Sequence, residues 1–339
     1  MKTKKLINAP DQVVDQMVEG VVMAHPDHLR LVDGNTRAVA GTHAPRQGKV
    51  GVVIGGGSGH EPAFLGYVGR RLADAAPIGN VFAAPPPDPI QACTHAADGG
   101  AGVVYLYGNY QGDVMNFDMA AEMVEMEGIQ TRTVLVTDDV ASAPSDRRQD
   151  RRGVAGDVFV FKAAGAAADL GYDLDGTAQT AERANQATLT MGVALAPCSL
   201  PATREPNFEL GPEEMEIGLG VHGEPGVDRG PLKSADEVAD DLIDRILAEL
   251  DAERGQRVQV LVNGLGATPR MELYLLYRRT KQRLDDAGLT IAKGFVGDYV
   301  TSLEMAGASI TVVKLDAELE RLLTHPADCA MFHLSGPQG

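Results

Sequence analysis

Segments with two different patterns of apolar residues follow one another along this chain, and together they predict an α/β fold. Short runs of consecutive valine, isoleucine and leucine indicate strands buried on both faces, since such strands lack polar alternation. These runs lie at residues 48–54, 101–109, 131–139 and 256–264. Between them, apolar residues spaced three or four positions apart, or alanine-rich stretches, indicate helices. The predicted helical segments are residues 11–32, 113–128, 158–171, 180–192 and 234–255.

The order of these segments predicts how the chain divides. Strand, helix and strand follow one another over residues 101–139, which is typical of a βαβ unit with parallel strands. The second half repeats this style, with a helix that begins after Ser234 and carries Glu237 in the capping-box position. We therefore expect two similar α/β domains, residues 1–188 and 189–339, each with a mainly parallel sheet flanked by helices.

Composition narrows the class of protein. The 339 residues suffice for one large or two medium domains, and the net charge of −17 disfavours binding to nucleic acid or to an anionic membrane surface. Three distant cysteines without a CxxC pair indicate a reducing compartment, and the dispersed histidines predict no metal site. Without an apolar signal segment or a run of 18 apolar residues, the chain is expected to be cytoplasmic.

The stretch GGGSGHEPA, residues 55–63, directly follows the first predicted strand. It contains no Walker A lysine, and the dinucleotide pattern G-x-G-x-x-G fails because its third glycine would fall at His60 or at Pro62. Its backbone N–H groups can still face an oxygen-rich ligand, and Pro62 suits the first turn of a following helix. The alternative is a tight strand–helix turn in which His60 is merely exposed.

Two further stretches carry candidate catalytic groups. Asp113, in GNYQGDVMNF at 108–117, follows a strand at the sheet edge where open α/β sheets bind ligands. It also fits the N-cap of the next helix. His222, in MEIGLGVHGEPG at 215–226, has small neighbours, and its HGEP order echoes GHEP at 59–62. The alternative for His222 is an incidental histidine in a turn.

Taken together, these stretches resemble the dihydroxyacetone kinase K domain. The resemblance rests on GGGSGHEP, GNYQGDVMNF and GLGVHGEPG, with DRRQDRRGVAG, MGVALAPCSLPA, LVNGLGATP and GDYVTSLEMAG. It extends from Lys5 to about Leu323, which is nearly the whole chain. The resemblance implies two α/β halves, of which the second carries a covalent histidine, and a homodimer.

The resemblance also implies roles for individual residues. His222 matches a histidine that binds the carbonyl carbon of a short ketose as a hemiaminal, while His60 and Asp113 match groups that bind its hydroxyls and assist proton removal. This chemistry is reasonable because a neutral imidazole nitrogen is a nucleophile and a ketone is an electrophile. Covalent capture would also select a ketone over glycerol. The implied substrate-binding residues are Gly57, Ser58, Gly59, His60, Gly108, Asp113 and His222.

The resemblance implies that this chain itself binds no cofactor. In the family, a separate L domain carries the nucleotide and magnesium, and this chain has no fused L domain within its 339 residues. We therefore expect a stand-alone subunit that works with an L-type subunit. In phosphotransferase-system versions, an M-type subunit recharges that partner.

Two positions depart from the family pattern. Gly108 stands where the family commonly has a lysine, and Ala84 stands where it commonly has a serine. Losing an ammonium group and a hydroxyl would leave a larger and less polar pocket. Two hypotheses stay open: a different ketone, such as erythrulose or a deoxy or branched analogue, or dihydroxyacetone itself.

Two other classes of function compete with a ketose kinase. A ketone-sensing regulator would need capture by His222 but no base, so the presence of His60 and Asp113 favours the kinase. A dinucleotide-dependent oxidoreductase is disfavoured by the failed glycine spacing.

Overall fold

The computed structural model describes residues 2–32 and 34–336 and separates into two compact units. Each unit is assembled from three segments of the chain. Unit 1 comprises residues 1–6, 137–156 and 185–317, and unit 2 comprises residues 7–136, 157–184 and 318–339. The break at 184–185 lies close to the boundary predicted at residue 188.

Three segments belong to the unit that a division into continuous halves would not give them, and the first of these is residues 1–6 of unit 1. Residues 137–156 belong to unit 1, where Arg148 donates hydrogen bonds to the carbonyls of Asn185 and Thr188. Residues 318–339 belong to unit 2, where strand β15 (Ala327–Cys329) pairs with β5 (Gly69–Arg70) and β16 (His333–Leu334). Each unit is therefore closed by a segment from the far side of the predicted boundary.

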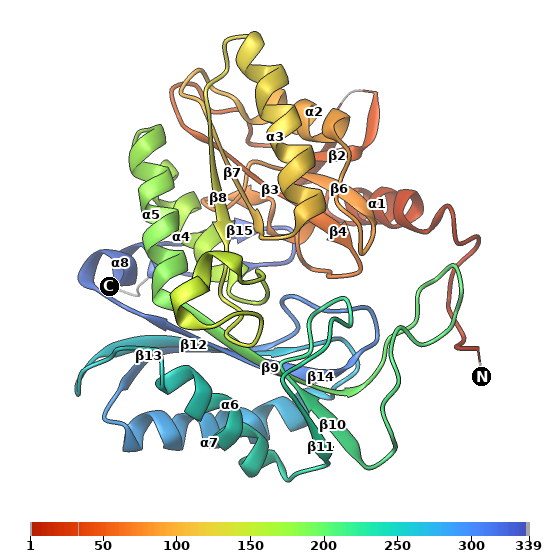
Figure 1. Ribbon diagram of the computed structural model, residues 1–339. Helices are drawn as coiled ribbons and strands as arrows, with labels where there is room; N and C mark the ends of the chain where they lie inside the picture. The colour runs from red at the N-terminus through yellow and green to blue at the C-terminus, as the bar shows by residue number, and fades with distance from the viewer. Residues whose placement is uncertain (1, 33, 337–339) are drawn as a thin grey trace. The chain divides into compact units, whose positions relative to one another are not determined.

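The main sheet of unit 2 has the strand order β1-β2-β6-β3-β7-β8, and β4 pairs with β6 (Figure 1). Its strands are β1 (Leu29–Val32), β2 (Asn35–Gly41), β3 (Gly51–Ile54), β4 (Gly56–Ser58), β6 (Ala75–Val81), β7 (Val103–Gly108) and β8 (Thr131–Val136). The pairs β6–β3, β3–β7, β7–β8 and β4–β6 are parallel, whereas β1–β2 and β2–β6 are antiparallel. A mainly parallel sheet is thus confirmed for this unit.

Helices cover the central strands of unit 2, which explains their continuous apolar runs. The helices are α1 (Val13–Ala24), α2 (Pro87–Ala97), α3 (Gln111–Met126), α4 (Asp157–Asp169), α5 (Leu174–Ala187) and α8 (Ala317–Thr324). Val53 and Tyr105 pack with Ile90 of α2 and Phe117 of α3. The alternate residues of β3 and β7 are also buried, and both strands contact α4, which is buried over nearly its whole length.

The sheet of unit 1 has the order β11-β10-β9-β14-β12-β13, and only β12 and β13 run parallel. Its strands are β9 (Thr188–Ala196), β10 (Glu214–Ile217), β11 (Asp228–Pro231), β12 (Arg257–Gly264), β13 (Thr290–Gly297) and β14 (Ala306–Lys314). The predicted α/β class is confirmed, but a mainly parallel sheet is wrong for this unit. The reason is connectivity, because a helical crossover, α7 (Arg270–Asp286), returns the chain in the same direction only between β12 and β13.

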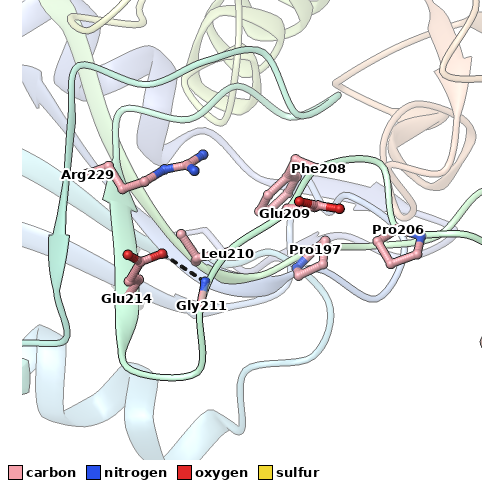
Figure 2. A pocket seen from close by; sticks show the side chains of 8 residues that line it. All are labelled: Pro197, Pro206, Phe208, Glu209, Leu210, Gly211, Glu214 and Arg229. Carbon is pink, nitrogen blue, oxygen red and sulfur yellow. Dashed lines mark hydrogen bonds between the residues drawn. The ribbon is translucent and has the colours of Figure 1, made fainter. Parts of the chain in front are cut away.

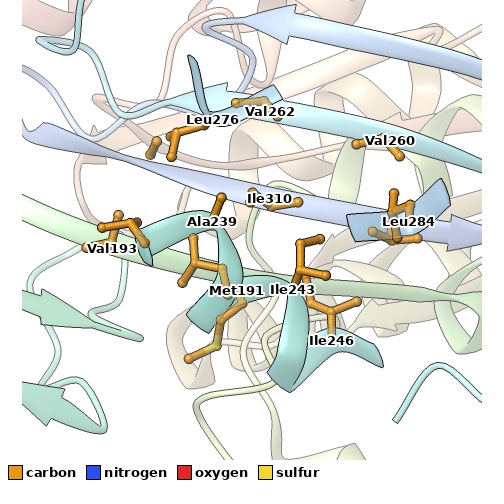
Figure 3. Packing of buried hydrophobic residues seen from close by; sticks show 14 of the residues in the cluster. Met191, Val193, Ala239, Ile243, Ile246, Val260, Val262, Leu276, Leu284 and Ile310 are labelled. Atoms are coloured by element: carbon orange, nitrogen blue, oxygen red, sulfur yellow. The ribbon is translucent and has the colours of Figure 1, made fainter. Parts of the chain in front are cut away.

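The core of unit 1 lies between one face of this sheet and the helices α6 (Ala235–Leu247) and α7 (Figure 3). Met191, Val193, Val260, Val262 and Ile310 contribute alternate positions of their strands, as the two-residue period of a strand requires. Leucine and isoleucine side chains of the two helices fill the opposite wall.

The predicted start of helix α6 is confirmed. The Ser234 hydroxyl accepts a hydrogen bond from the Glu237 backbone N–H, while the Glu237 carboxylate accepts one from the Ser234 backbone N–H at 2.9 Å. Such a cap stabilises a helix by about 1 kcal/mol.

Two stretches predicted to be helical throughout change to a strand in the structure. The helix predicted over residues 11–32 ends at Ala24, because Pro26 cannot continue it, and β1 follows. The helix predicted over residues 180–192 ends at Ala187, where β9 begins. Both stretches change period from helix to strand without a glycine between them.

A glycine of α4 provides a test of packing in unit 2. A Cβ atom on Gly165 would lie 2.3 Å from the carbonyl oxygen of Leu72 and 2.4 Å from its Cα, so Gly165→Ala should destabilise the fold by about 1–3 kcal/mol. Gly20, in α1, is the matched control because nothing lies within 4 Å of its Cβ position, and Gly20→Ala should stabilise by about 0.5–1 kcal/mol. Urea unfolding of both variants checks the opposite signs, and equal effects would contradict this packing.

Candidate functional site

Three loops of unit 2 meet where parallel strands end. Strands β3, β6 and β7 run in the same direction, so their carboxyl ends lie at one edge of the sheet. The Ser58 hydroxyl donates a hydrogen bond to the Gly79 carbonyl at 2.8 Å, and the Asn116 amide of α3 donates one to the Pro85 carbonyl at 2.8 Å. The glycine-rich stretch, the loop after β6 and the start of α3 therefore form one edge, as open α/β sheets do at their ligand sites.

The glycine-rich stretch is a short strand, β4, rather than an open phosphate loop. It pairs in parallel with β6, and a Cβ atom on Gly57 would lie 2.7 Å from the Ala83 backbone nitrogen. The Gly59 N–H donates to both carboxylate oxygens of Glu61, at 3.0 and 3.2 Å. Glycine at position 57 is thus required by the close approach of the two backbones.

His60 is buried, with 4% of its surface exposed, so the alternative of an exposed turn histidine is wrong. Its ring stacks on Phe82 with the centroids 5.1 Å apart and the planes inclined by 21°. The predicted helix start at Pro62 is also wrong, because a three-residue 3₁₀ turn, Leu65–Tyr67, follows instead. The stacking fixes the plane of the imidazole at the carboxyl edge of the sheet.

The neighbouring Glu61 is half-buried. Burial raises its pKa, against the effect of the hydrogen bond from the Gly59 N–H. Its link to that N–H closes the turn that carries His60.

Asp113 is buried in the first turn of α3, and it is not the N-cap residue that the sequence suggested. The N-cap is Tyr110, so Asp113 is the third residue of the helix. The positive end of the helix dipole favours a carboxylate there. A buried carboxyl group at the ligand edge of the sheet is a candidate for proton transfer.

The two positions that depart from the family pattern belong to the same edge of unit 2. Gly108 is the buried last residue of β7, immediately before the loop that leads into α3. Ala84 lies in the loop after β6, and its Cβ would be 3.3 Å from a Cβ on Gly112. Both positions therefore carry small groups beside the turn that precedes Asp113.

His222 lies in unit 1, in the loop that joins the antiparallel strands β10 and β11. The Asn207 amide donates to the His222 carbonyl at 3.0 Å, and the Ser302 hydroxyl donates to the Val221 carbonyl. These bonds hold the backbone of the loop on both sides of the imidazole. The side chain of His222 keeps 24% of its surface exposed, so a ligand can reach it.

Glu224 fixes the imidazole of His222. Its Oε1 lies 2.9 Å from His222 Nδ1, and its Oε2 accepts the His222 backbone N–H at 2.9 Å. Burial opposes ionisation of Glu224, but the hydrogen bond and the charge of His222 lower its pKa to about 2. Because an ionised carboxylate can only accept, Nδ1 carries the proton, and the lone pair of a neutral ring lies on Nε2.

The two glutamates of the echoed motifs play related roles. Glu61 and Glu224 each accept a hydrogen bond from the backbone N–H two residues earlier. Glu224 also reaches the ring of the histidine in its own motif, because in HGEP the histidine itself is two residues earlier, whereas in GHEP a glycine is. The repeated Glu-Pro was the signal in the sequence that could have singled out Glu224.

The seven predicted site residues fall into two groups. Six of them belong to unit 2, at the carboxyl edge of its sheet, and His222 belongs to unit 1. Sequence reasoning missed Glu224 and also Phe82, for which no local signal exists because it follows a different strand.

Two pockets of unit 1 are lined by none of these residues. The first, of about 470 Å³, lies in the loop region before β10 (Figure 2). Its lining residues are Pro197, Pro206, Phe208, Glu209, Leu210, Gly211, Glu214 and Arg229. A second pocket, of about 300 Å³ and mostly apolar, lies beside α6 and α7.

Within residues 2–32 and 34–336, no three histidine, cysteine, aspartate or glutamate side chains are placed to hold a metal ion. The same residues include no helix with the length and apolar character needed to span a bilayer.

Comparison with known proteins finds relatives that match nearly the whole chain. The dihydroxyacetone-binding subunit DhaK of PTS-dependent dihydroxyacetone kinase 2 from Listeria innocua is 46% identical, over 97% of this chain and 99% of its own length. L-erythrulose 1-kinase from Mycolicibacterium smegmatis is also 46% identical, over 96% of this chain but only 57% of its own length. The solved structure of the dihydroxyacetone kinase operon co-activator Dha-DhaQ matches with a TM-score of 0.88 at 30% identity, over 95% of this chain and 99% of that one.

The same similarity appears at the level of the family. Residues 19–331 match the Dak1 domain. This match covers most of the chain and includes both the carboxyl edge of unit 2 and the His222 loop of unit 1. The chain is a member of the Dak1 domain family.

Proposed function

We propose that this chain is the substrate-binding subunit of a ketose kinase. It binds a short-chain ketose covalently through His222 and presents the terminal hydroxyl of that ketose for phosphorylation. The observation that carries this proposal is the 2.9 Å contact of His222 Nδ1 with Glu224, which leaves Nε2 as the nucleophilic nitrogen. The comparisons support it, since the Listeria relative is a dihydroxyacetone-binding subunit and the Mycolicibacterium relative is an erythrulose kinase.

The capture step follows from the geometry around His222. The Nε2 lone pair forms a bond to the carbonyl carbon, the carbonyl π bond breaks, and the oxygen takes a proton from solvent. The ring becomes positively charged, and the ionised Glu224 beside Nδ1–H stabilises that charge. Release of the Nδ1 proton to solvent, in exchange for the proton that the oxygen took up, leaves a neutral hemiaminal.

The phosphorylation step needs a base and a donor. Asp113 removes the proton of the terminal hydroxyl, with His60 as the second candidate. The nucleotide and Mg²⁺ come from an L-type partner subunit, and an M-type subunit recharges that partner in a phosphotransferase-system version. A homodimer and a cytoplasmic location belong to the same proposal.

The substrate is a ketose with a hydroxyl next to its carbonyl. Dihydroxyacetone and the tetrulose erythrulose both have this group, and the names of the two relatives support both. Gly108 and Ala84 leave free the space that longer side chains would fill. This supports the larger ketose, erythrulose, as the substrate.

A second candidate function is a ketone sensor that captures its ligand without turnover. The match to the Dha-DhaQ co-activator favours it, together with the accessible His222. A sensor has no need of Asp113 or His60, which this chain contains.

Reconstitution separates these candidates. The chain is mixed with an L-type subunit and either ATP or a phosphotransferase donor system, and dihydroxyacetone, erythrulose and glycerol are offered separately. We expect phosphate esters of the ketoses but not of glycerol, detected by ³¹P NMR and mass spectrometry. The absence of any sugar phosphate with either donor would support the sensor, and a higher kcat/KM for dihydroxyacetone than for erythrulose would refute an altered substrate preference.

A further inference from the structure

An arginine from a distant part of the sequence lies beside the His222 loop in unit 1. Arg152 belongs to the segment 137–156, and its Nη2 donates a hydrogen bond to the Gly218 carbonyl at 3.2 Å. Its Nη1 lies 3.9 Å from Oε2 of Glu224, the oxygen that accepts the His222 backbone N–H. The guanidinium therefore contacts both the start of the loop and the carboxylate that holds the imidazole.

We propose that Arg152 is a positioning residue for His222 and acts through Glu224. This inference rests on the proposed covalent role of His222. Arg152 does not touch the reacting nitrogen. It holds the Glu224 carboxylate in the orientation that keeps the proton on Nδ1 and the lone pair on Nε2.

The backbone of the loop is built around this contact. A Cβ atom on Gly220 would lie 2.2 Å from Glu224 Oε2 and 2.5 Å from Arg152 Nη1. Any larger residue at position 220 would occupy the space in which the guanidinium and the carboxylate meet. The absence of a side chain there is what allows Arg152 to reach Glu224.

Asp139 holds Arg152 in place. Its Oδ2 accepts hydrogen bonds from the guanidinium at 2.7 and 2.9 Å, and its backbone N–H donates to the Arg152 carbonyl at 3.1 Å. Burial raises the pKa of Asp139 to about 6, an effect that Arg152 opposes and the charge of Asp138 increases. Asp139 and Arg152 therefore depend on each other, and a guanidinium bound at two atoms cannot easily swing away from Glu224.

Loss of Arg152 should change which tautomer the His222 imidazole adopts. The Glu224 carboxylate would lose the cationic neighbour that lies 3.9 Å from its Oε2, and it could rotate away from Nδ1. A free histidine prefers the tautomer with the proton on Nε2, so part of the population would change to the form that has no nucleophilic lone pair there. The expected result is slower capture of a ketone rather than loss of the fold.

Two measurements on Arg152→Gln and Arg152→Lys test the proposal. The first is the ¹⁵N NMR spectrum of the labelled imidazole without any ketone, which distinguishes the two tautomers. The second is the rate of capture of ¹³C-labelled dihydroxyacetone between pH 6 and pH 8. For Arg152→Gln we expect a mixture of tautomers and capture slowed by about tenfold to a hundredfold. Arg152→Lys should recover part of both effects because it restores the charge.

Arg229→Gln is the matched control. Arg229 also pairs with a buried carboxylate of unit 1, Glu216, whose other oxygen accepts the Gly226 N–H at the far end of the same loop. This control should keep the wild-type tautomer and capture rate. An unchanged tautomer and rate in Arg152→Gln would overturn the proposal, as would equal changes in both variants, since those would indicate general loosening of the loop.

The two proposals can fail separately. If the wild-type protein captures no ketone, the proposed function fails, whereas the tautomer measured without ligand still reports on Arg152. If Arg152→Gln does not fold, Glu224→Gln gives the second test, because removing the carboxylate charge should produce the same mixture of tautomers. A retained Nδ1–H tautomer in Glu224→Gln would contradict the claim that the Glu224 carboxylate holds the proton on Nδ1.

Discussion

Replacing His222 with alanine is expected to abolish covalent capture of a ketone while leaving the fold intact. The side chain is partly exposed in a loop, so its removal creates no cavity in the core. The C–N bond of a hemiaminal needs a nucleophilic nitrogen, and alanine offers none. With dihydroxyacetone labelled with ¹³C at its carbonyl carbon, the wild-type protein should convert the ketone resonance to that of a tetrahedral carbon, and His222→Ala should not.

The control for this experiment is another partly exposed histidine. His95 lies on α2 of unit 2 and contacts Glu127, so His95→Ala removes an imidazole without touching the His222 loop. It should capture the ketone as the wild type does. A tetrahedral carbon signal of equal size in His222→Ala would refute the role of His222, and its loss in both variants would show that the assay does not report on one site.

The sequence allowed the central strands β3 and β7 of unit 2 to be predicted because each is covered on both faces, which leaves a run of apolar residues. It did not reveal the direction of the strands in unit 1. That direction depends on which strands pair, and β9 and β14, which are adjacent in the sheet, lie far apart in the chain. Pairing over such a distance leaves no local pattern.

The candidate site shows the same division between local and distant information. His60, Asp113 and His222 could be singled out because each follows a strand or a glycine in a short stretch. The burial of His60 could not be predicted, because Phe82, on which it stacks, follows another strand. Arg152 was likewise part of a quoted motif, but nothing local indicated that it would meet Glu224.

Asp113→Asn is expected to retain capture of the ketone but to lose phosphoryl transfer. The amide has nearly the shape of the carboxylate and keeps its place in the first turn of α3, yet it cannot accept the proton of the terminal hydroxyl. Loss of a general base lowers the rate by about 10²- to 10⁴-fold. The ¹³C signal of the hemiaminal and the formation of sugar phosphate with an L-type subunit measure the two steps separately.

Asp118→Asn is the matched control, because it makes the same change on an exposed position of the same helix and should leave both steps unchanged. If Asp113→Asn keeps wild-type turnover, Asp113 is not the base, and His60 becomes the candidate. Loss of capture together with turnover would instead assign Asp113 to substrate binding. If the wild type captures and phosphorylates the ketone but Asp113→Asn only captures it, Asp113 acts as a base and not as a binding group. The same result distinguishes a kinase subunit from a sensor, because replacement of Asp113 would change nothing in a sensor.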